Sequence, residues 1–161
     1  MRLIIKQEVA AIEAEFNVKD EAGNLFFRIR GEKDYVHKNL HIFSVQGKEL
    51  ALFRKEGGSV PAIFDVFFQG KRVARIEQKF KIGTAGYDVR GPGWTVKGAV
   101  GFHTFSVFSG QEDIATISRS YNPVSDRYVL DYKYPGDAVL LLAVVVAIDV
   151  GYGNVRGVSG C

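Results

Sequence analysis

Residues 138–148 read Ala-Val-Leu-Leu-Leu-Ala-Val-Val-Val-Ala-Ile, and no side chain among them carries a polar atom. A membrane-spanning helix needs about 20 apolar residues, so this run is short for that role. Val and Ile also favour strands, which leaves a buried strand as a second alternative. However, Asp137 is suited to the N-cap of a helix and Gly151 to a left-handed stop after it. We therefore predict a helix over about residues 137–150.

A helix that is apolar on all sides must be buried on all sides, so the remaining chain has to surround it. From Phe16 onward the sequence repeats one unit: an alternating strand, a polar turn containing glycine, and a second strand. A closed sheet has no exposed edges, and one of about eleven strands can hold a central helix. The expected strands cover residues 16–18, 25–30, 40–43, 50–55, 64–66, 73–82, 87–89, 95–97, 105–108, 114–119 and 127–134.

The two ends of the chain are harder to assign. Residues 8–15 are rich in strong helix formers, but an opening strand there would complete the barrel, so we expect this segment to be mostly extended. The glycine-rich residues 151–161 are expected to form a flexible tail. The sequence thus predicts a single domain over residues 1–150.

The composition is that of a globular protein, with 47% hydrophobic and 24% charged residues in a chain of 161. A net charge of +3 is compatible with anionic partners but too weak to indicate nucleic acid, which we do not expect as a partner. The single cysteine, Cys161, excludes an internal disulfide framework and fits a reducing compartment. The apolar run near Met1 is too short for a secretory signal, so a cytoplasmic location is expected, with peripheral association at a membrane.

Several segments resemble one known family in their order and spacing. They are residues 16–24, 47–51, 70–76, 115–119 and the end of the apolar run, Val146-Ala147-Ile148-Asp149. The chain is similar over nearly its whole length to the tubby C-terminal-like proteins, specifically to the small bacterial members of the LURP-one-related group. The resemblance implies a mainly β fold, a closed antiparallel barrel of about twelve strands around a hydrophobic C-terminal helix. It departs from the family pattern over residues 9–15. Tubby relatives bind phosphoinositides, but likeness of fold alone does not transfer function.

The residues that could support catalysis are few. The sequence contains no HExxH, Cys-x-x-Cys, P-loop or Gly-x-Ser-x-Gly motif. Its three histidines, His37, His41 and His103, are expected at the surface, because a zinc site usually gathers three or four ligands. We therefore expect no enzyme activity, no cofactor and no metal site.

The most informative charged stretch is the hairpin strand 71–81. Alternation of side chains places Ala74, Ile76, Phe80 and Ile82 inward and the charged residues outward. Within the hairpin that contains this strand, only Glu77 is expected to oppose the positive charges. Each Lys or Arg near an anionic membrane contributes roughly 1 kcal/mol, although a merely solvated outer face is the simpler interpretation. The candidate headgroup contacts are Lys71, Arg72, Arg75, Lys79 and Lys81, and a second basic face is formed by Arg28, Arg30, Lys33 and Lys38.

The sequence leaves three functions open. The leading hypothesis is a non-enzymatic cytoplasmic domain that recognises anionic phospholipid headgroups at a membrane surface. The alternatives are a small-molecule carrier or sensor that uses the barrel interior and a protein-interaction scaffold. The sequence identifies neither the lipid or ligand, nor a protein partner, nor the oligomeric state.

Overall fold

The computed structural model describes residues 1–7, 15–32, 39–56, 61–81, 84–99, 103–120 and 127–150, with the backbone only for residues 80, 81, 84, 85 and 99. These residues form twelve strands, one short 3₁₀-helix and one α-helix. The strands are β1 Arg2–Gln7, β2 Glu15–Lys19, β3 Leu25–Gly31, β4 Asn39–Ser44, β5 Glu49–Lys55, β6 Ile63–Phe68, β7 Lys71–Lys81, β8 Thr84–Arg90, β9 Trp94–Ala99, β10 Thr104–Ser109, β11 Glu112–Ser120 and β12 Arg127–Tyr132.

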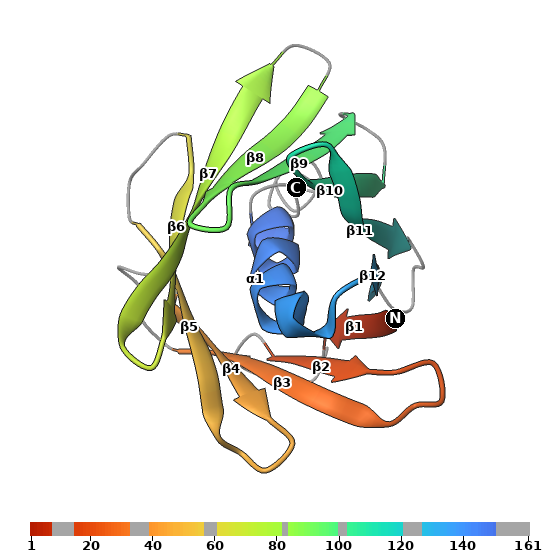
Figure 1. Cartoon of the computed structure of the whole chain (residues 1–161). Helices are drawn as coiled ribbons and strands as arrows, with labels where there is room; N and C mark the ends of the chain where they lie inside the picture. Colours follow the sequence, from red (N-terminus) through yellow and green to blue (C-terminus); the bar gives the residue numbers. More distant parts are fainter. Residues whose placement is uncertain are drawn as a thin grey trace, which may run out of the picture.

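The strands form a closed antiparallel barrel in which each strand pairs with its neighbour in the chain (Figure 1). The barrel closes between the first strand and the last, where Leu3 lies opposite Leu130 and the amino group of Met1 donates to the carbonyl oxygen of Tyr132 at 2.9 Å. Closure leaves no strand edge unpaired. The predicted fold class, a closed barrel of about twelve strands around a helix, is confirmed.

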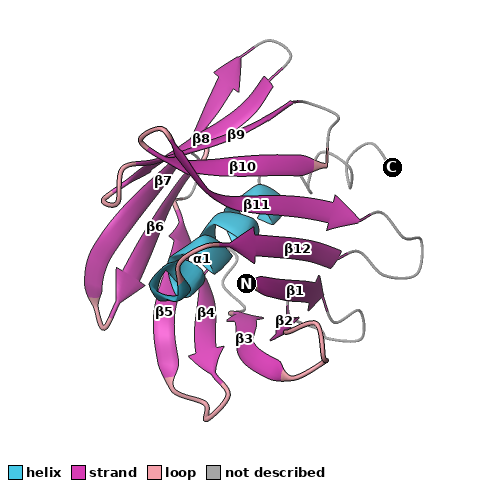
Figure 2. Cartoon of the chain, turned by 45° about the vertical axis from the view of Figure 1, so that its right-hand side comes forward, coloured by secondary structure: helices cyan, strands magenta, loops and turns pink. Residues whose placement is uncertain are grey.

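The apolar run forms the helix α1, Ala138–Ile148, which lies inside the ring of strands (Figures 1 and 2). Residues 141–148 are at most 1% exposed. The short helix η1, Pro135–Asp137, leads directly into α1, so the predicted start is in the right place. The predicted capping by Asp137 is wrong: its side chain makes no capping hydrogen bond, because this residue already has helical backbone angles. Gly151 lies outside the described residues.

Within the described part of the chain, no helix combines the length and the apolar character needed to cross a membrane.

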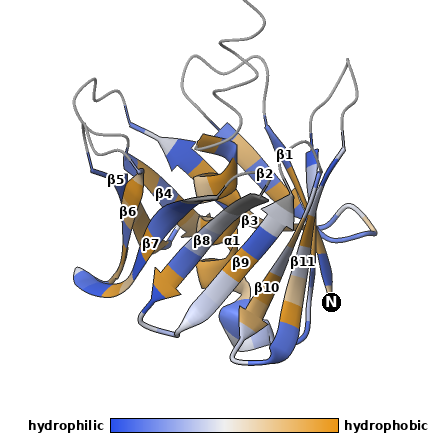
Figure 3. Cartoon of the chain, turned by 90° about the horizontal axis from the view of Figure 1, so that it is seen from above, coloured by the Kyte–Doolittle hydropathy of each residue, from blue (hydrophilic) through white to orange (hydrophobic). Residues whose placement is uncertain are grey.

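The core forms where the inner face of the barrel meets α1. Buried apolar side chains recur at about every second residue of the strands and point toward the helix. Figure 3 shows hydrophobic residues as orange bands along the strands and over α1. Phe53 and Phe64 stack within this core with ring centroids 4.9 Å apart. The tight turns between strands use glycine as predicted, for example Gly47 (φ +87°) and Gly110 (φ +62°), where a side chain would be strained.

The first strand, Arg2–Gln7, was not predicted from the sequence. Of residues 8–15, which were expected to be mostly extended, Glu15 begins β2 and residues 8–14 lie outside the described residues. Strand β12 ends at Tyr132, and Tyr134 beyond it is 48% exposed. On β7, Gln78 follows the predicted alternation and points inward with Ala74 and Ile76; it is 5% exposed, and its amide oxygen accepts the backbone N–H of Ala62 at 3.4 Å.

Candidate functional site

The predicted basic hairpin is an ion-pair network. Asp65, on the adjacent strand β6, lies directly opposite Arg75. The Arg75 Nε donates to this carboxylate at 2.9 Å and its terminal nitrogen to Glu56 at 3.2 Å. The hydrogen bond and charge of Asp65 raise the pKa of Arg75 above its usual value. Arg72 also lies 3.7 Å from Asp65. The expectation that only Glu77 opposes these charges is therefore wrong.

The lysines of the hairpin differ from one another. Lys79 lies 3.4 Å from Glu77 and 3.5 Å from Asp88, so it too is paired with carboxylates. Lys71 is exposed at the start of β7 and has no charged partner among the described residues. The side chain of Lys81 lies outside the described part. The structure therefore leaves Lys71 as the candidate of this set whose charge is not neutralised nearby.

The second basic face is only partly described. Arg28 and Arg30 both point outward from β3, and both are exposed. The Arg30 Nε lies 3.4 Å from Glu15, whereas Arg28 has no ion-pair partner among the described residues. Lys33 and Lys38 lie outside these residues. Arg28 is thus a cation available to a ligand on the outer wall.

The outer wall around Arg28 carries an unexpected row of apolar side chains. In the register of the sheet, Arg28 pairs with Phe43 on β4, and farther along the wall Leu52 on β5 pairs with Phe67 on β6. The side chains of Phe43, Leu52 and Phe67 are only partly buried. We call the set Phe26, Phe43, Val45, Leu52 and Phe67 the outer apolar face.

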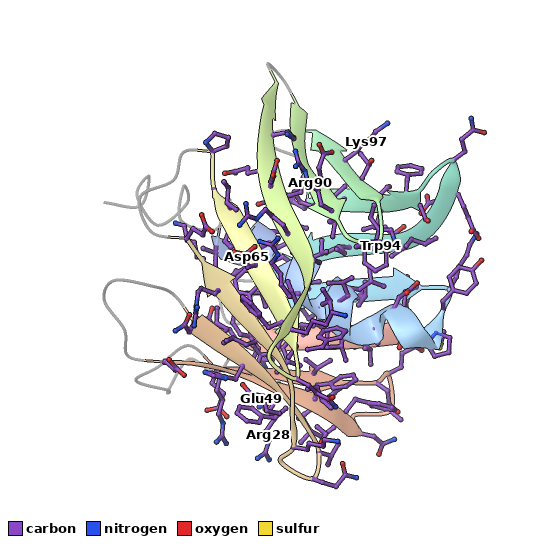
Figure 4. The ribbon with its side chains drawn as sticks, turned by 60° about the vertical axis from the view of Figure 1, so that its left-hand side comes forward. Arg28, Glu49, Asp65, Arg90, Trp94 and Lys97 are labelled. Carbon is purple, nitrogen blue, oxygen red and sulfur yellow. The ribbon has the colours of Figure 1, made fainter. Side chains whose placement is uncertain are left out.

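The most exposed part of this face is the rung formed by Phe26 and Val45. These residues lie one step beyond the paired residues Phe27 and Ser44, where β3 and β4 meet their turns. Phe26 is 45% exposed and Val45 is 53% exposed. Two large apolar side chains beside the free cation of Arg28 give this edge an amphiphilic character. Arg28 and Glu49 lie on the same side of the barrel in Figure 4.

The sequence contained a signal for this face. Leu25-Phe26-Phe27, Leu50-Ala51-Leu52-Phe53 and Phe67-Phe68 are unbroken apolar runs inside strands. A strand with one solvated face should alternate apolar and polar residues, so such runs indicate apolar side chains on both faces. A prediction from alternation alone treats the outer face of each strand as polar and therefore misses the apolar residues on it.

A groove of about 390 Å³ opens on the same wall between β4, β5 and β6. His41, Leu52 and Phe67 form one row across the three strands. Arg54 lies at one end of the groove, and Glu49 with the turn residue Gly70 lies at the other. The groove therefore combines an apolar floor with charged groups of opposite sign at its ends.

His41 points outward from β4 and is held between two carboxylates. Its Nδ1 contacts Glu49 and its Nε2 contacts Glu32. Burial lowers the pKa of His41, but the hydrogen bonds that the ring nitrogens make to the Glu49 and Glu32 carboxylates, together with the charges of these carboxylates, outweigh it, so the pKa is raised above its usual value. The two carboxylates thus favour the protonated imidazole, in which both ring nitrogens are donors, at the edge of the groove.

No metal centre is apparent in the described ranges, which contain no group of three or more His, Cys, Asp or Glu side chains placed to hold one ion. Glu32 and Glu49 contact opposite nitrogens of the His41 ring, so this triad does not converge on a point. His103 is exposed just before β10. His37 and Cys161 lie outside the described residues.

These features define a class of protein: a closed antiparallel barrel around an axial apolar helix, with exposed apolar side chains and a groove on its outer wall. The chain belongs to the LURP-one-related family, whose model matches residues 1–149. It is 19% identical to the uncharacterised protein YxjI of Bacillus subtilis (strain 168), covering 93% of each chain. It is also similar in fold to an X-ray structure of a protein from Arabidopsis thaliana, with a TM-score of 0.63 and 19% identity, over 92% of this chain and 91% of the other.

Proposed function

We propose that this protein is a non-enzymatic cytoplasmic binding domain that attaches to anionic phospholipid headgroups at a membrane surface. The observation that carries the proposal is the pairing of exposed apolar side chains, Phe26 and Val45, with the unneutralised cation of Arg28 on one edge of the barrel. The affinity of a peripheral protein for a membrane increases both with the apolar area that it buries in the bilayer and with its electrostatic attraction to anionic lipids. The sequence contains none of the catalytic motifs considered above, which supports a non-catalytic role.

This edge is a better candidate than the hairpin strand β7. Arg75 and Lys79 would have to leave Asp65, Glu56, Glu77 and Asp88 before they could contact a headgroup. Arg28 has no such partner to give up among the described residues. Lys71 and Arg72 stay in the proposal as secondary contacts, because they are exposed beside the β6–β7 turn.

The structure gives less support to a ligand inside the barrel. The wall residues and α1 form one continuous apolar core. The groove on the outer wall is lined by residues of β4, β5, β6 and the β6–β7 turn, not by residues of α1.

Co-sedimentation with liposomes tests the proposal. The protein should sediment with vesicles containing phosphatidylserine, less so as salt rises, and poorly with phosphatidylcholine alone. The double change Phe26→Ser with Val45→Ser should remove most of the binding. Arg28→Gln should weaken it about fivefold, since one cation near the surface contributes roughly 1 kcal/mol.

Matched controls come from β12, which lies three strands from β3 around the barrel. Arg127→Gln removes an exposed arginine from β12, and Tyr134→Ser removes an exposed ring after it. Both should bind like the parent. The headgroup proposal is wrong if the parent binds neutral and anionic vesicles equally or does not sediment. The assigned edge is wrong if the Phe26 and Val45 double variant binds like the parent.

A further inference from the structure

The groove on β4–β6 has an arginine whose hydrogen-bonding capacity is only partly used. The Nε of Arg54 donates to the side-chain oxygen of Asn39 at 3.1 Å. Its guanidinium carbon lies 5.7 Å from the centroid of the Phe67 ring, so the side chain leans over the floor of the groove. Its terminal nitrogens contact no acceptor among the described residues. Arg54 therefore presents part of a planar donor fork to the groove.

The nearest carboxylate does not satisfy this fork. Asp65 lies opposite Arg54 in the register of β5 and β6, which is where an ion pair would be expected. Instead, Asp65 binds Arg75 at 2.9 Å and lies 3.7 Å from Arg72. Because the two arginines of β7 occupy Asp65, Arg54 remains available to an anion from outside the chain.

The rest of the groove is suited to an apolar body. Leu50, Leu52 and Phe67 line it between the two ends. Glu49 lies five residues from Arg54 along β5, a distance of about 16 Å at the rise of a strand. Glu49 is engaged by His41, so the anion-binding end is the Arg54 end. A ligand would place its charge at Arg54 and extend its apolar part toward Gly70.

We infer that this groove is a binding site for a carboxylate with an apolar tail, of the class of medium-chain fatty acids. Arginine forks bind carboxylates in a planar two-bond geometry, which fits the free nitrogens of Arg54. The volume of about 390 Å³ lies at the lower end of small-molecule sites. A peptide strand is a poorer fit, because the closed barrel offers no free edge for it to join.

This site is independent of the proposed membrane edge. Membrane attachment depends on Phe26, Val45 and Arg28, none of which lines the groove. The two proposals therefore make separate predictions for separate substitutions, and either can fail while the other holds.

Isothermal titration with decanoate, below its micelle concentration, tests the inference on the full chain. The parent should bind one decanoate per protein, and decan-1-ol and acetate should bind at least tenfold more weakly. Arg54→Gln should weaken decanoate binding at least tenfold. Phe67→Ala should also weaken it, because the apolar floor is lost. Amide NMR shifts on addition of decanoate should concentrate at Leu52, Phe67 and Gly70.

The control is Arg127→Gln, which removes an exposed arginine of β12 outside the groove and should bind decanoate like the parent. If Arg54→Gln does not fold, Arg54→Lys keeps the charge but not the fork and should still lose severalfold in affinity. The inference is overturned if the parent binds no decanoate, if decan-1-ol binds as tightly, or if the Arg54 variants bind like the parent.

Discussion

The hydroxyl group of Tyr87, on β8, donates a hydrogen bond to the carbonyl oxygen of Ala147, in the last turn of α1, at 2.9 Å. Both residues are completely buried. The last four carbonyl groups of a helix have no partner within the helix, so a buried one needs a donor from elsewhere in the chain. The wall of the barrel thus supplies a polar contact that the axial helix needs.

Tyr87→Phe should therefore reduce the free energy of unfolding by about 1–2 kcal/mol, since it leaves a buried carbonyl oxygen without its donor. For a chain of this length each kcal/mol corresponds to about 2–4 °C in melting temperature. The matched control is Tyr132→Phe, because the hydroxyl of Tyr132 has no hydrogen-bond partner among the described residues. Equal melting temperatures for the two variants would contradict the assigned role of Tyr87.

Burial along α1 predicts a graded response to truncation of its leucines. Leu141 is fully buried, whereas Leu140 is only partly buried. Leu141→Ala should cost about 2–5 kcal/mol in chemical denaturation, and Leu140→Ala clearly less. Leu141→Asp should prevent folding, because an unpaired charge in an apolar core costs more than the protein's stability can offset. A soluble Leu141→Asp variant with a cooperative melt would contradict the axial position of the helix.

The helix could be predicted from sequence because its signal is local. A helix formed by residues 138–148 is apolar on every face, and every face is buried only if the rest of the chain surrounds the helix. The first strand was missed because Leu3, Ile4 and Ile5 form a short run whose partner, β12, lies at the far end of the chain. Its existence depends on a contact across more than a hundred residues.

The ion pair between Asp65 and Arg75 depends on a detail that sequence does not show. Counting back from the β6–β7 turn, a regular hairpin would place Asp65 opposite Ala74. A bulge between Val66 and Phe67 shifts the register by one residue and places Arg75 there instead. The single extra residue of this bulge thus places the charge of Arg75 beside the carboxylate of Asp65.

Stability should depend on pH through His41. Its pKa is raised in the folded state, so the protonated form is favoured by folding. The resulting stabilisation is fully present below the unfolded pKa of about 6.5 and is lost as the pH rises through the folded pKa. Glu32, Glu49 and Arg30, opposite His41 on β3, are the charged groups facing it. Denaturation curves from acid to mildly alkaline pH should show this loss.

His41→Gln should flatten that dependence, because it removes the imidazole between Glu32 and Glu49. The same pH dependence in parent and His41→Gln would exclude the imidazolium as its source.

Two substitutions on β7 should differ in stability although both reverse one charge. Arg75→Glu removes the partner of Asp65, whose side chain is 9% exposed, and adds a like charge beside it. It should cost about 1–3 kcal/mol or more. Lys79→Glu acts on a more exposed pair and should change stability by about 0.5 kcal/mol or less. Urea denaturation of the two variants checks the difference, and equal losses would argue against a structural role for Asp65.

Closure of the barrel by β1 and β12, with α1 following all twelve strands, has a consequence for synthesis of the chain. As the chain leaves the ribosome from its N-terminus, the strands can pair in order, but the apolar inner wall has nothing to cover it until the final element emerges. The contact between Met1 and Tyr132, 131 residues apart, also forms late. Such non-local contacts slow folding. Refolding should therefore be slow, and nascent chains that stop before α1 should be held by chaperones.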